Sequence, residues 1–378
     1  MNLFGVHLTL WIGPTLPVPV SPFLAEALRS VEVTHSDQGP SGFQLTFQIG
    51  RATALDLMDY RLLTDPLLQP FNRVVVIVRF AIAPQVLMDG VITNQQLNPS
   101  NEPGASTLTV TGEDLSVLMD LEEEHSSHLA MPDYGIVFQL VTKYGRYGLV
   151  PPPPPTLNPQ ALVPRNPLEE MTQRPADLTD RAYIQQLADD YGFLFYVTPG
   201  PLPLASRVHW GPPELLSIPQ AALSINMGPE TNVDSLNFTF DGLRPQQVTS
   251  VVGESQTQNT YSTPSSTRSI FRLARNNFEA RRKVSLTDDD PERAKIRAQS
   301  MVDQSFDEVV TANGQLDALR YNGLLNPRGL VGLRGVGQTY DGFYYVKSVT
   351  HNISKGRYTQ GFSLSREGTG TTTPFVLP

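Results

Sequence analysis

Residues 42–49 alternate apolar and polar side chains with a period of two, which is typical of a β-strand with one buried and one solvated face. Residues 31–35, 86–93 and 106–111 have similar strand-like patterns. Residues 73–83 are almost wholly apolar, as in a strand covered on both faces or placed in a seam between subunits. Gly, Asn, Ser and Pro separate these segments, so the first third of the chain predicts an antiparallel barrel or sandwich.

Helical patterns follow this strand-rich third. Thr111 and Asp114 form a capping-box pattern, which predicts a helix beginning at Thr111. Apolar residues at helical spacing predict a second helix over 133–144. A third helix with the same spacing is predicted to end at Gly192 and to lead directly into a strand. Acidic residues before Pro291 predict the start of a fourth helix, because they favour the positive end of the helix dipole.

Strand patterns return after Phe306, so strands bracket the helices instead of alternating with them. Residues 342–366 predict a β-hairpin whose turn lies at 354–357. The apolar parity shifts between Val346 and Val349, which predicts a β-bulge in the first strand of this hairpin. The chain is therefore expected to be an α+β protein, mainly antiparallel β.

Composition limits the possible functions. A length of 378 residues suggests about two or three domains. The net charge of −9, from 28 Lys and Arg against 37 Asp and Glu, argues against nucleic-acid recognition. Charged residues make up only 17%, below the usual ~25%, which favours assembly into a larger complex. The absence of cysteine excludes disulfides and Cys-ligated zinc.

The sequence also bears on where the chain resides. No Lys or Arg precedes the apolar residues at the N-terminus, and the longest apolar runs are of strand length, so we expect neither a secretory signal nor a direct membrane span. Synthesis in the cytoplasm is the resulting expectation. Five consecutive prolines at 151–155 predict an extended surface loop, for which an SH3-type ligand is the alternative interpretation.

Few residues suggest catalysis. His125 and His128, with Glu122–Glu124 before them, form the best metal candidate, but the polar end of a helix or a loop explains them as well. The acid pair Asp189 and Asp190 is expected on a solvated helix face. No His-Glu-x-x-His, Gly-x-Ser-x-Gly or Walker A pattern occurs. The chain is therefore predicted to have no catalytic, metal or cofactor site and not to be an enzyme.

Three stretches resemble a known family in their order along the chain. The hairpin at 342–366 contains a Gly-x-Tyr-x-Val-x-x-Val-x-His strand and a Gly-x-Tyr-Thr strand that ends in Arg. Residues 179–193 look like the family's helix-into-strand segment, and residues 232–238 like its mid-chain strand. The family is phage late-control D, which includes contractile-tail baseplate hubs and the hub part of type VI secretion spike proteins.

The resemblance implies two β-barrel-like tube domains with a helical α/β insert. Residues 1–115 and 207–250 would form the first tube domain, residues 116–206 the insert with the Pro-rich loop, and residues 251–378 the second tube domain. Three chains would then form a ring that connects a hexameric tail tube to a trimeric spike. Because the sequence ends at Pro378 without an OB-type domain, the spike is expected to be a separate protein.

Partners and contacts follow as hypotheses. The expected partners are two further copies of the chain, the tail tube protein, the separate spike protein and other baseplate proteins, within the baseplate of a phage tail or contractile injection particle. Residues 367–378 are expected to be a flexible linker with an apolar tip. The candidate interface residues are Val74, Val76, Val78, Phe375, Val376 and Leu377.

Two other functional classes remain open. A β-sandwich that binds carbohydrate would need exposed aromatic platforms, whereas Trp11 and Trp210 are the only tryptophans and lie in strand-like settings. A wall hydrolase would need a pair of acids or a His-metal cluster in a cleft. No such pair or cluster is visible in the sequence.

Overall fold

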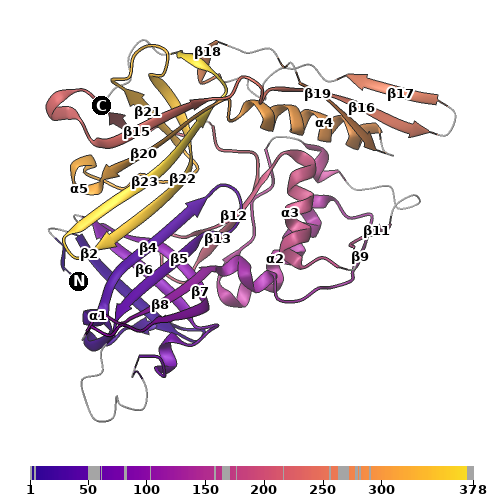
Figure 1. The fold of residues 1–378 in the computed structure, drawn as a ribbon. Helices are drawn as coiled ribbons and strands as arrows, with labels where there is room; N and C mark the ends of the chain where they lie inside the picture. Colours follow the sequence, from indigo (N-terminus) through magenta and orange to yellow (C-terminus); the bar gives the residue numbers. More distant parts are fainter. Residues whose placement is uncertain are drawn as a thin grey trace.

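The computed structural model describes most of the chain as strands joined by short helices and loops (Figure 1). The predicted α+β class with mainly antiparallel sheet is confirmed. The described residues are those of 1–378 other than residues 1, 4–5, 50–59, 61, 81–82, 103, 157–158, 164–170, 176, 216, 255–256, 263–271, 277–279, 281, 289–290 and 373–378.

The N-terminal β unit follows the strand order β1-β2-β6-β7-β8-β5-β4, with neighbours antiparallel. Alternating residues of these strands fill its core, in which Val33, Leu45 and Val110 are fully buried. Its elements are β1 (Asn2–Leu3), β2 (Val6–Gly13), β3 (Val18–Pro19), α1 (Pro22–Ala27), β4 (Leu28–Ser36), β5 (Gly42–Gln48), η2 (Pro66–Leu68), β6 (Arg73–Phe80), β7 (Ala83–Asn98) and β8 (Thr107–Asp114).

The C-terminal β unit continues the same sheet through β22, β23, β20 and β15, and β21 pairs with both β22 and β14. Its own core contains the buried side chains of Tyr344, Val346 and Leu364. Its elements are β14 (Gln220–Ser224), η6 (Gly228–Glu230), β15 (Val233–Phe240), β20 (Val310–Asp317), α5 (Ala318–Tyr321), β21 (Leu330–Arg334), β22 (Gly342–Ser354) and β23 (Arg357–Arg366).

In the sheet formed by the described residues, the antiparallel strand pair β4 with β22 joins the two units; we call this pair the seam. It runs in register from Ser36 opposite Ser348 to Ser30 opposite Ser354. The two units expected as separate barrels are therefore parts of one open 14-stranded sheet, and neither barrel is closed.

The insert lies beside the N-terminal β unit, with α2 and α3 stacked next to β7 and β12 (Figure 1). Its core is built from α2, α3 and the sheet β10-β13-β12, around the buried Ile136, Ile184 and Trp210. Its elements are η3 (Leu115–Met119), β9 (Ser127–Leu129), α2 (Asp133–Lys143), η4 (Gly145–Tyr147), β10 (Leu149–Val150), η5 (Pro159–Leu162), β11 (Met171–Gln173), α3 (Asp180–Tyr191), β12 (Leu194–Pro199) and β13 (Ser206–Gly211).

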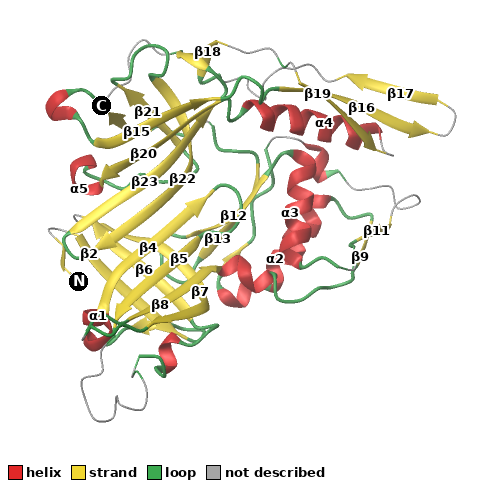
Figure 2. Ribbon diagram, in the orientation of Figure 1, coloured by secondary structure: helices red, strands yellow, loops and turns green. Residues whose placement is uncertain are grey.

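One more part of the chain packs helix α4 against a small sheet of order β17-β16-β19, at the upper right of Figure 2. We call this part the third layer. Helix α4 also contacts α3, so this layer closes over the insert. Its elements are β16 (Gln246–Glu254), β17 (Thr257–Ser262), β19 (Arg282–Asp288) and α4 (Pro291–Phe306), and a short pair is formed by β18 (Ala274–Asn276) and β24 (Thr369–Thr371).

Several local predictions are confirmed. Helix α2 begins at Asp133, and α3 is capped by Thr179 and ends at Gly192 in the left-handed conformation, with φ of 66°. The hairpin β22–β23 has the predicted bulge, a register shift between Val346 and Ser348. Helix α4 also forms, although part of the acidic run before it lies outside the described residues.

The helix predicted at Thr111 is wrong. Residues Thr107–Asp114 form strand β8, whose side chains alternate between buried and partly exposed. Asp114 caps the short 3₁₀ helix η3 instead, because its carboxylate accepts the backbone N–H of Ser116 at 2.9 Å. The period-two pattern of the strand extends through the apparent capping box.

Residues 207–250 were expected to complete the first tube domain. In the structure their strands pair with strands of three other parts of the chain. Strand β13 belongs to the insert, where it pairs with β12 and β10. Strands β14 and β15 pair with β21 and β20, so they extend the C-terminal β unit. Strand β16 pairs with β19 in the third layer.

Two segments expected to be loops are packed. In the proline run, Pro152 and Pro155 are buried, and the Tyr134 hydroxyl on α2 donates to the Pro152 carbonyl at 3.1 Å. The start of the expected flexible tail is also ordered, because β24 pairs with β18 and Glu367 Oε1 accepts the N–H of Ala274 at 2.9 Å. No helix within the described residues is long and apolar enough to span a membrane.

Candidate functional site

The seam buries two histidines, one from each β unit. The rings of His35 on β4 and His351 on β22 meet edge to face, with centroids 5.8 Å apart. His351 Nδ1 lies 2.8 Å from the Tyr358 hydroxyl. Burial lowers the pKa of His35 well below its usual value and that of His351 to about 4, so both imidazoles are neutral near pH 7.

Arg328 connects three parts of the chain. Its Nε donates to the Ser36 carbonyl at 3.1 Å, and its Nη1 donates to Thr198 Oγ1 at 2.8 Å. The guanidinium also lies 3.7 Å from the centre of the Tyr196 ring, which itself stacks on His209 at 4.5 Å. The C-terminal β unit therefore holds the end of β4 and strand β12 with one side chain.

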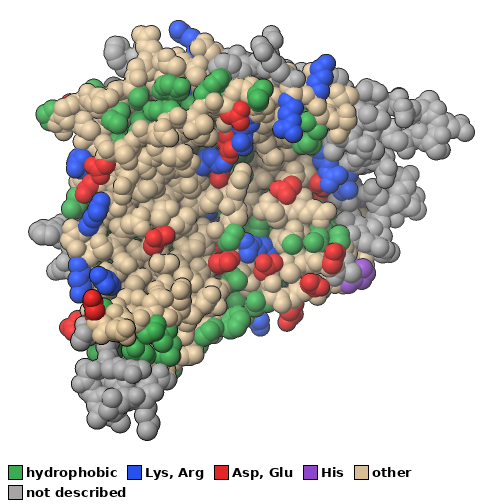
Figure 3. Space-filling view, viewed as in Figure 1, with side chains coloured by type: hydrophobic (Ala, Val, Ile, Leu, Met, Phe, Trp, Pro, Cys, Tyr) green, Lys and Arg blue, Asp and Glu red, His purple; other side chains and the backbone are tan. Residues whose placement is uncertain are grey.

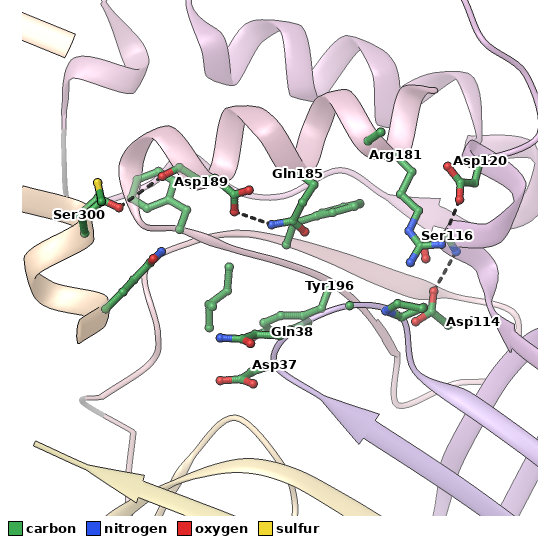
Figure 4. Close-up of a pocket in the computed structure, with 18 residues that line it drawn as sticks. Asp37, Gln38, Asp114, Ser116, Asp120, Arg181, Gln185, Asp189, Tyr196 and Ser300 are labelled. Carbon is green, nitrogen blue, oxygen red and sulfur yellow. Dashed lines mark hydrogen bonds and ion pairs between the residues drawn. The ribbon is translucent and has the colours of Figure 1, made fainter. Parts of the chain in front are cut away.

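A cleft of about 700 Å³ opens beside this junction. Its walls come from the loop at residues 37–40, from η3, α3 and β12, and from α4. Four segments that are far apart in the sequence, within residues 37–40, 114–120, 181–196 and 300–304, thus contribute to it. Figure 4 shows the loop on one side and α3 on the other, with α4 at one end and η3 at the opposite end; the labelled residues are Asp37, Gln38, Asp114, Ser116, Asp120, Arg181, Gln185, Asp189, Tyr196 and Ser300.

Asp37 is the unusual acid of this cleft. Its side chain is only 5% exposed, and Oδ1 has no hydrogen-bond partner. Burial raises its pKa to about 6, although the charges of Lys347 and Arg328 act in the opposite direction. Asp114 is equally buried but satisfied, because its carboxylate accepts the N–H of Ser41 at 2.6 Å and that of Ser116 at 2.9 Å. Asp37 therefore differs from Asp114 in having a buried carboxylate oxygen without a hydrogen-bond partner.

The predicted interface residues are not brought together at this cleft. Val74, Val76 and Val78 are fully buried in the core of the N-terminal β unit, where β6 lies between β2 and β7. The chain's own core explains this apolar run, so it gives no argument for a contact with another subunit. The remaining three, Phe375, Val376 and Leu377, lie outside the described residues.

The metal candidate has a structural role. His128 is buried on β9, where its ring stacks on Tyr183 at 6.3 Å and its Nε2 lies 3.3 Å from Ser126 Oγ. Burial, followed by the charges of Lys143 and Arg174, lowers its pKa. Within the described part of the chain, no three His, Asp or Glu side chains are grouped so that they could hold a metal ion.

The acid pair on α3 divides between two surroundings. Asp189 is exposed at the cleft, as predicted, and accepts from the Gln185 amide at 2.8 Å. Asp190 is half-buried and pairs with Arg297 of α4 at 2.6 Å. The latter contact holds the third layer against the insert.

Sequence reasoning missed Asp37 and Arg328. Asp37 lies in the polar stretch Ser36–Pro40, which has the composition of an ordinary turn, and Arg328 follows a proline in another loop. Arg328 has no local signal, because its partner Ser36 lies 292 residues away along the chain. Asp37 has none because its burial depends on packing between distant segments.

Solved structures with this fold come from tail and secretion proteins. A tail protein of Neisseria meningitidis MC58 superposes with a TM-score of 0.66 at 15% identity, over 97% of this chain and 98% of that one. A 43 kDa tail protein of prophage MuSo2 from Shewanella oneidensis gives 0.64 at 12% identity, over 95% and 98%. An E. coli component of the type VI secretion system, itself similar to the T4 bacteriophage tail proteins gp27 and gp5, gives 0.55 at 13% identity, over 93% and 77%.

Sequence comparison adds no closer relative. No protein-family model matches the chain, and a search of curated proteins finds no match. The likeness to the tail proteins is therefore one of three-dimensional structure, and it extends over nearly the whole of both chains. The chain has the fold of phage tail proteins and of a type VI secretion component.

Proposed function

We propose that this chain is a structural baseplate hub of a contractile tail or injection system. In this role three copies form a ring that connects the tail tube to a spike protein. The observation that carries the proposal is the superposition on the Neisseria tail protein, which covers 97% of this chain and 98% of the other at a TM-score of 0.66. A match over both full lengths includes the two β units, the insert and the third layer together.

The construction of the chain supports a structural role. The two β units share one sheet, and Arg328 fastens the insert to both of them. Parts tied together in this way suit a role in which the chain keeps its shape when it binds a partner. Acidic and basic side chains are interspersed on the face drawn in Figure 3, whereas a nucleic-acid-binding surface gathers its basic side chains in one patch.

The mass of the assembly in solution tests the proposal. We expect light scattering of the purified chain to give three times 41.7 kDa, and the complex with added tail tube and spike proteins to contain three copies of this chain. Electron microscopy of the same sample should show a ring with threefold symmetry. A chain that stays monomeric at high concentration with both partners added would contradict the hub role.

The apolar tip Phe375, Val376 and Leu377 is proposed as a contact to the spike. Deleting residues 373–378 tests this contact and preserves β24, which pairs with β18. The shortened chain should still form rings but retain less spike protein in a pull-down at matched concentrations. Equal retention by the full and shortened chains would remove the tip from the interface.

A further inference from the structure

The five consecutive prolines of the insert bury one side of the run and expose the others. Pro152 and Pro155 are buried. Pro153 and Pro154 are exposed, and Pro151 is partly exposed. Consecutive prolines adopt the polyproline II helix, because each ring fixes φ near −65° and disfavours helical backbone in the residue before it. That helix has about three residues per turn, which matches the burial of every third proline. We call its outward sides, with Pro151, Pro153 and Pro154, the proline ridge.

Both ends of the run are fixed to the insert. Leu149, two residues before the run, is buried in the insert core and pairs with Ser206 of β13. Ala161, after the run, is fully buried in the same core. Between these two anchors the Tyr134 hydroxyl of α2 donates to the Pro152 carbonyl at 3.1 Å. The backbone of the proline ridge is therefore held in place before a partner binds, which lowers the entropy cost of binding.

The outward positions have the spacing of polyproline ligands. Pro151 and Pro154 are three residues apart, so they lie on one side of the helix and form a Pro-x-x-Pro pattern. Pro153 lies on the neighbouring outward side, and Val150, directly before the run, is 47% exposed. The ridge is thus an apolar surface on two adjacent sides, which is the surface that a groove lined by aromatic side chains accepts.

A base lies beside the start of the ridge, although no charged residue occurs from 147 to 164 in the sequence. Strand β10 runs parallel to β13, and Val150 stands opposite Arg207 in their register. The preceding pair, Leu149 and Ser206, is buried, whereas Val150 and Arg207 are exposed, so these two share the outer face of the small sheet. Among the described residues, Arg207 has no ion-pair partner. Its guanidinium is therefore available to a carboxylate of a partner.

We propose that the proline ridge and Arg207 together bind a partner protein, in a groove that is lined by aromatic side chains and has a carboxylate at one end. The aromatic rings would pack on the outward prolines. Their indole or phenol groups would donate to backbone carbonyls of the polyproline helix, which forms no hydrogen bonds within itself. The carboxylate would pair with the Arg207 guanidinium. The inference concerns the insert and does not depend on the hub role.

Titration of an isolated SH3 domain tests the contact. The probe is an isotope-labelled SH3 domain with acidic residues beside its aromatic groove, and NMR follows its signals while the unlabelled full chain is added. We expect saturable changes in the signals of the groove residues. The peptide Leu-Val-Pro-Pro-Pro-Pro-Pro-Thr, residues 149–156, should bind at least about tenfold more weakly than the full chain, because it lacks Arg207 and the fixed backbone.

Substitutions on the ridge and at the base locate the contact. The double variant Pro151→Ala with Pro154→Ala should weaken binding at least about tenfold. Arg207→Gln should also weaken it about tenfold, and because this side chain is exposed the variant tests the contact without disturbing the core. The matched control is Pro219→Ala, at an exposed proline outside the run, which should change binding by less than about twofold.

The fluorescence of Trp210, which lies in the insert core, should be the same in every variant and shows that the insert is folded. Three results would overturn the proposal. They are the absence of saturable binding by the native chain, unchanged binding in Arg207→Gln or in the double proline variant, and binding of the free peptide as tight as that of the full chain.

Discussion

Replacing Asp37 by Asn should stabilise the protein near neutral pH. The pKa of Asp37 is about 6 in the folded chain against 3.8 for the free group, so the fold favours the neutral acid. The contribution of the neutral Asp37 to the free energy of unfolding is present below about pH 4 and is lost as the pH rises through about 6. A shift of roughly two units, at about 1.4 kcal/mol each, is a penalty of about 3 kcal/mol at pH 7.5. Asparagine is neutral at every pH and avoids this penalty.

Urea unfolding followed by tryptophan fluorescence measures the effect at several pH values between 4.5 and 7.5. The free energy of unfolding of Asp37→Asn should exceed that of the native chain by about 3 kcal/mol at pH 7.5, and the gain should shrink towards zero at the acid end. Asp177→Asn, at an exposed position, is the matched control and should show no such trend. A gain that is independent of pH, or a loss at pH 7.5, would refute this account of the Asp37 environment.

Five further substitutions, two of which serve as comparison variants, test the junction and the sheet. Arg328→Met should lower the free energy of unfolding, measured in urea, by roughly 3–5 kcal/mol. Arg328→Lys should recover only part of this loss, because lysine lacks the planar, two-pronged guanidinium. A loss below about 1 kcal/mol in Arg328→Met would show that the guanidinium is dispensable. Gly112→Ala should cost roughly 1–3 kcal/mol or more, because the new Cβ would lie 2.4 Å from the Phe43 ring, whereas Gly361→Ala, with open space around its Cβ, should cost less than about 1 kcal/mol. Burial lowers the pKa of His351 to about 4, so the stability that depends on its neutral form is present above about pH 6.5 and is lost as the pH falls towards 4. His351→Gln should therefore reduce the fall in the free energy of unfolding between about pH 6.5 and 4. An unchanged pH dependence would contradict the buried, neutral state of His351.

The strands and the long helices were predictable because their signals are local. Burial alternates along β5 in the way that its sequence alternates, and α3 is delimited by Thr179 and Gly192, which act through neighbouring backbone groups. The helix predicted at Thr111 failed for the opposite reason. A Thr and an acid three residues apart are compatible with both a cap and a partly exposed strand face, and pairing with β5 and β7 decides in favour of the strand.

The site was beyond the reach of the sequence because it is made only by long-range packing. Asp37, Ala182 and Met301 contribute to one cleft although more than a hundred residues separate each from the next. The apolar run at Val74–Val78 shows the same limit, since its composition cannot distinguish burial in the chain's own sheet from burial between subunits. The order of the strands in the sheet decides between these two kinds of burial, and no single sequence segment determines that order.

The seam also determines how the chain can be taken apart. Strand β4 pairs with β5 on one side and with β22 on the other, so removing either unit would leave a strand of nine residues or more with an open edge of backbone donors and acceptors. A gene fragment that encodes only one unit should therefore yield aggregated protein, and a protease cut within the insert should leave the two ends of the molecule attached to each other. Engineers who want to exchange one unit between related proteins must carry β4 and β22 together as a matched pair.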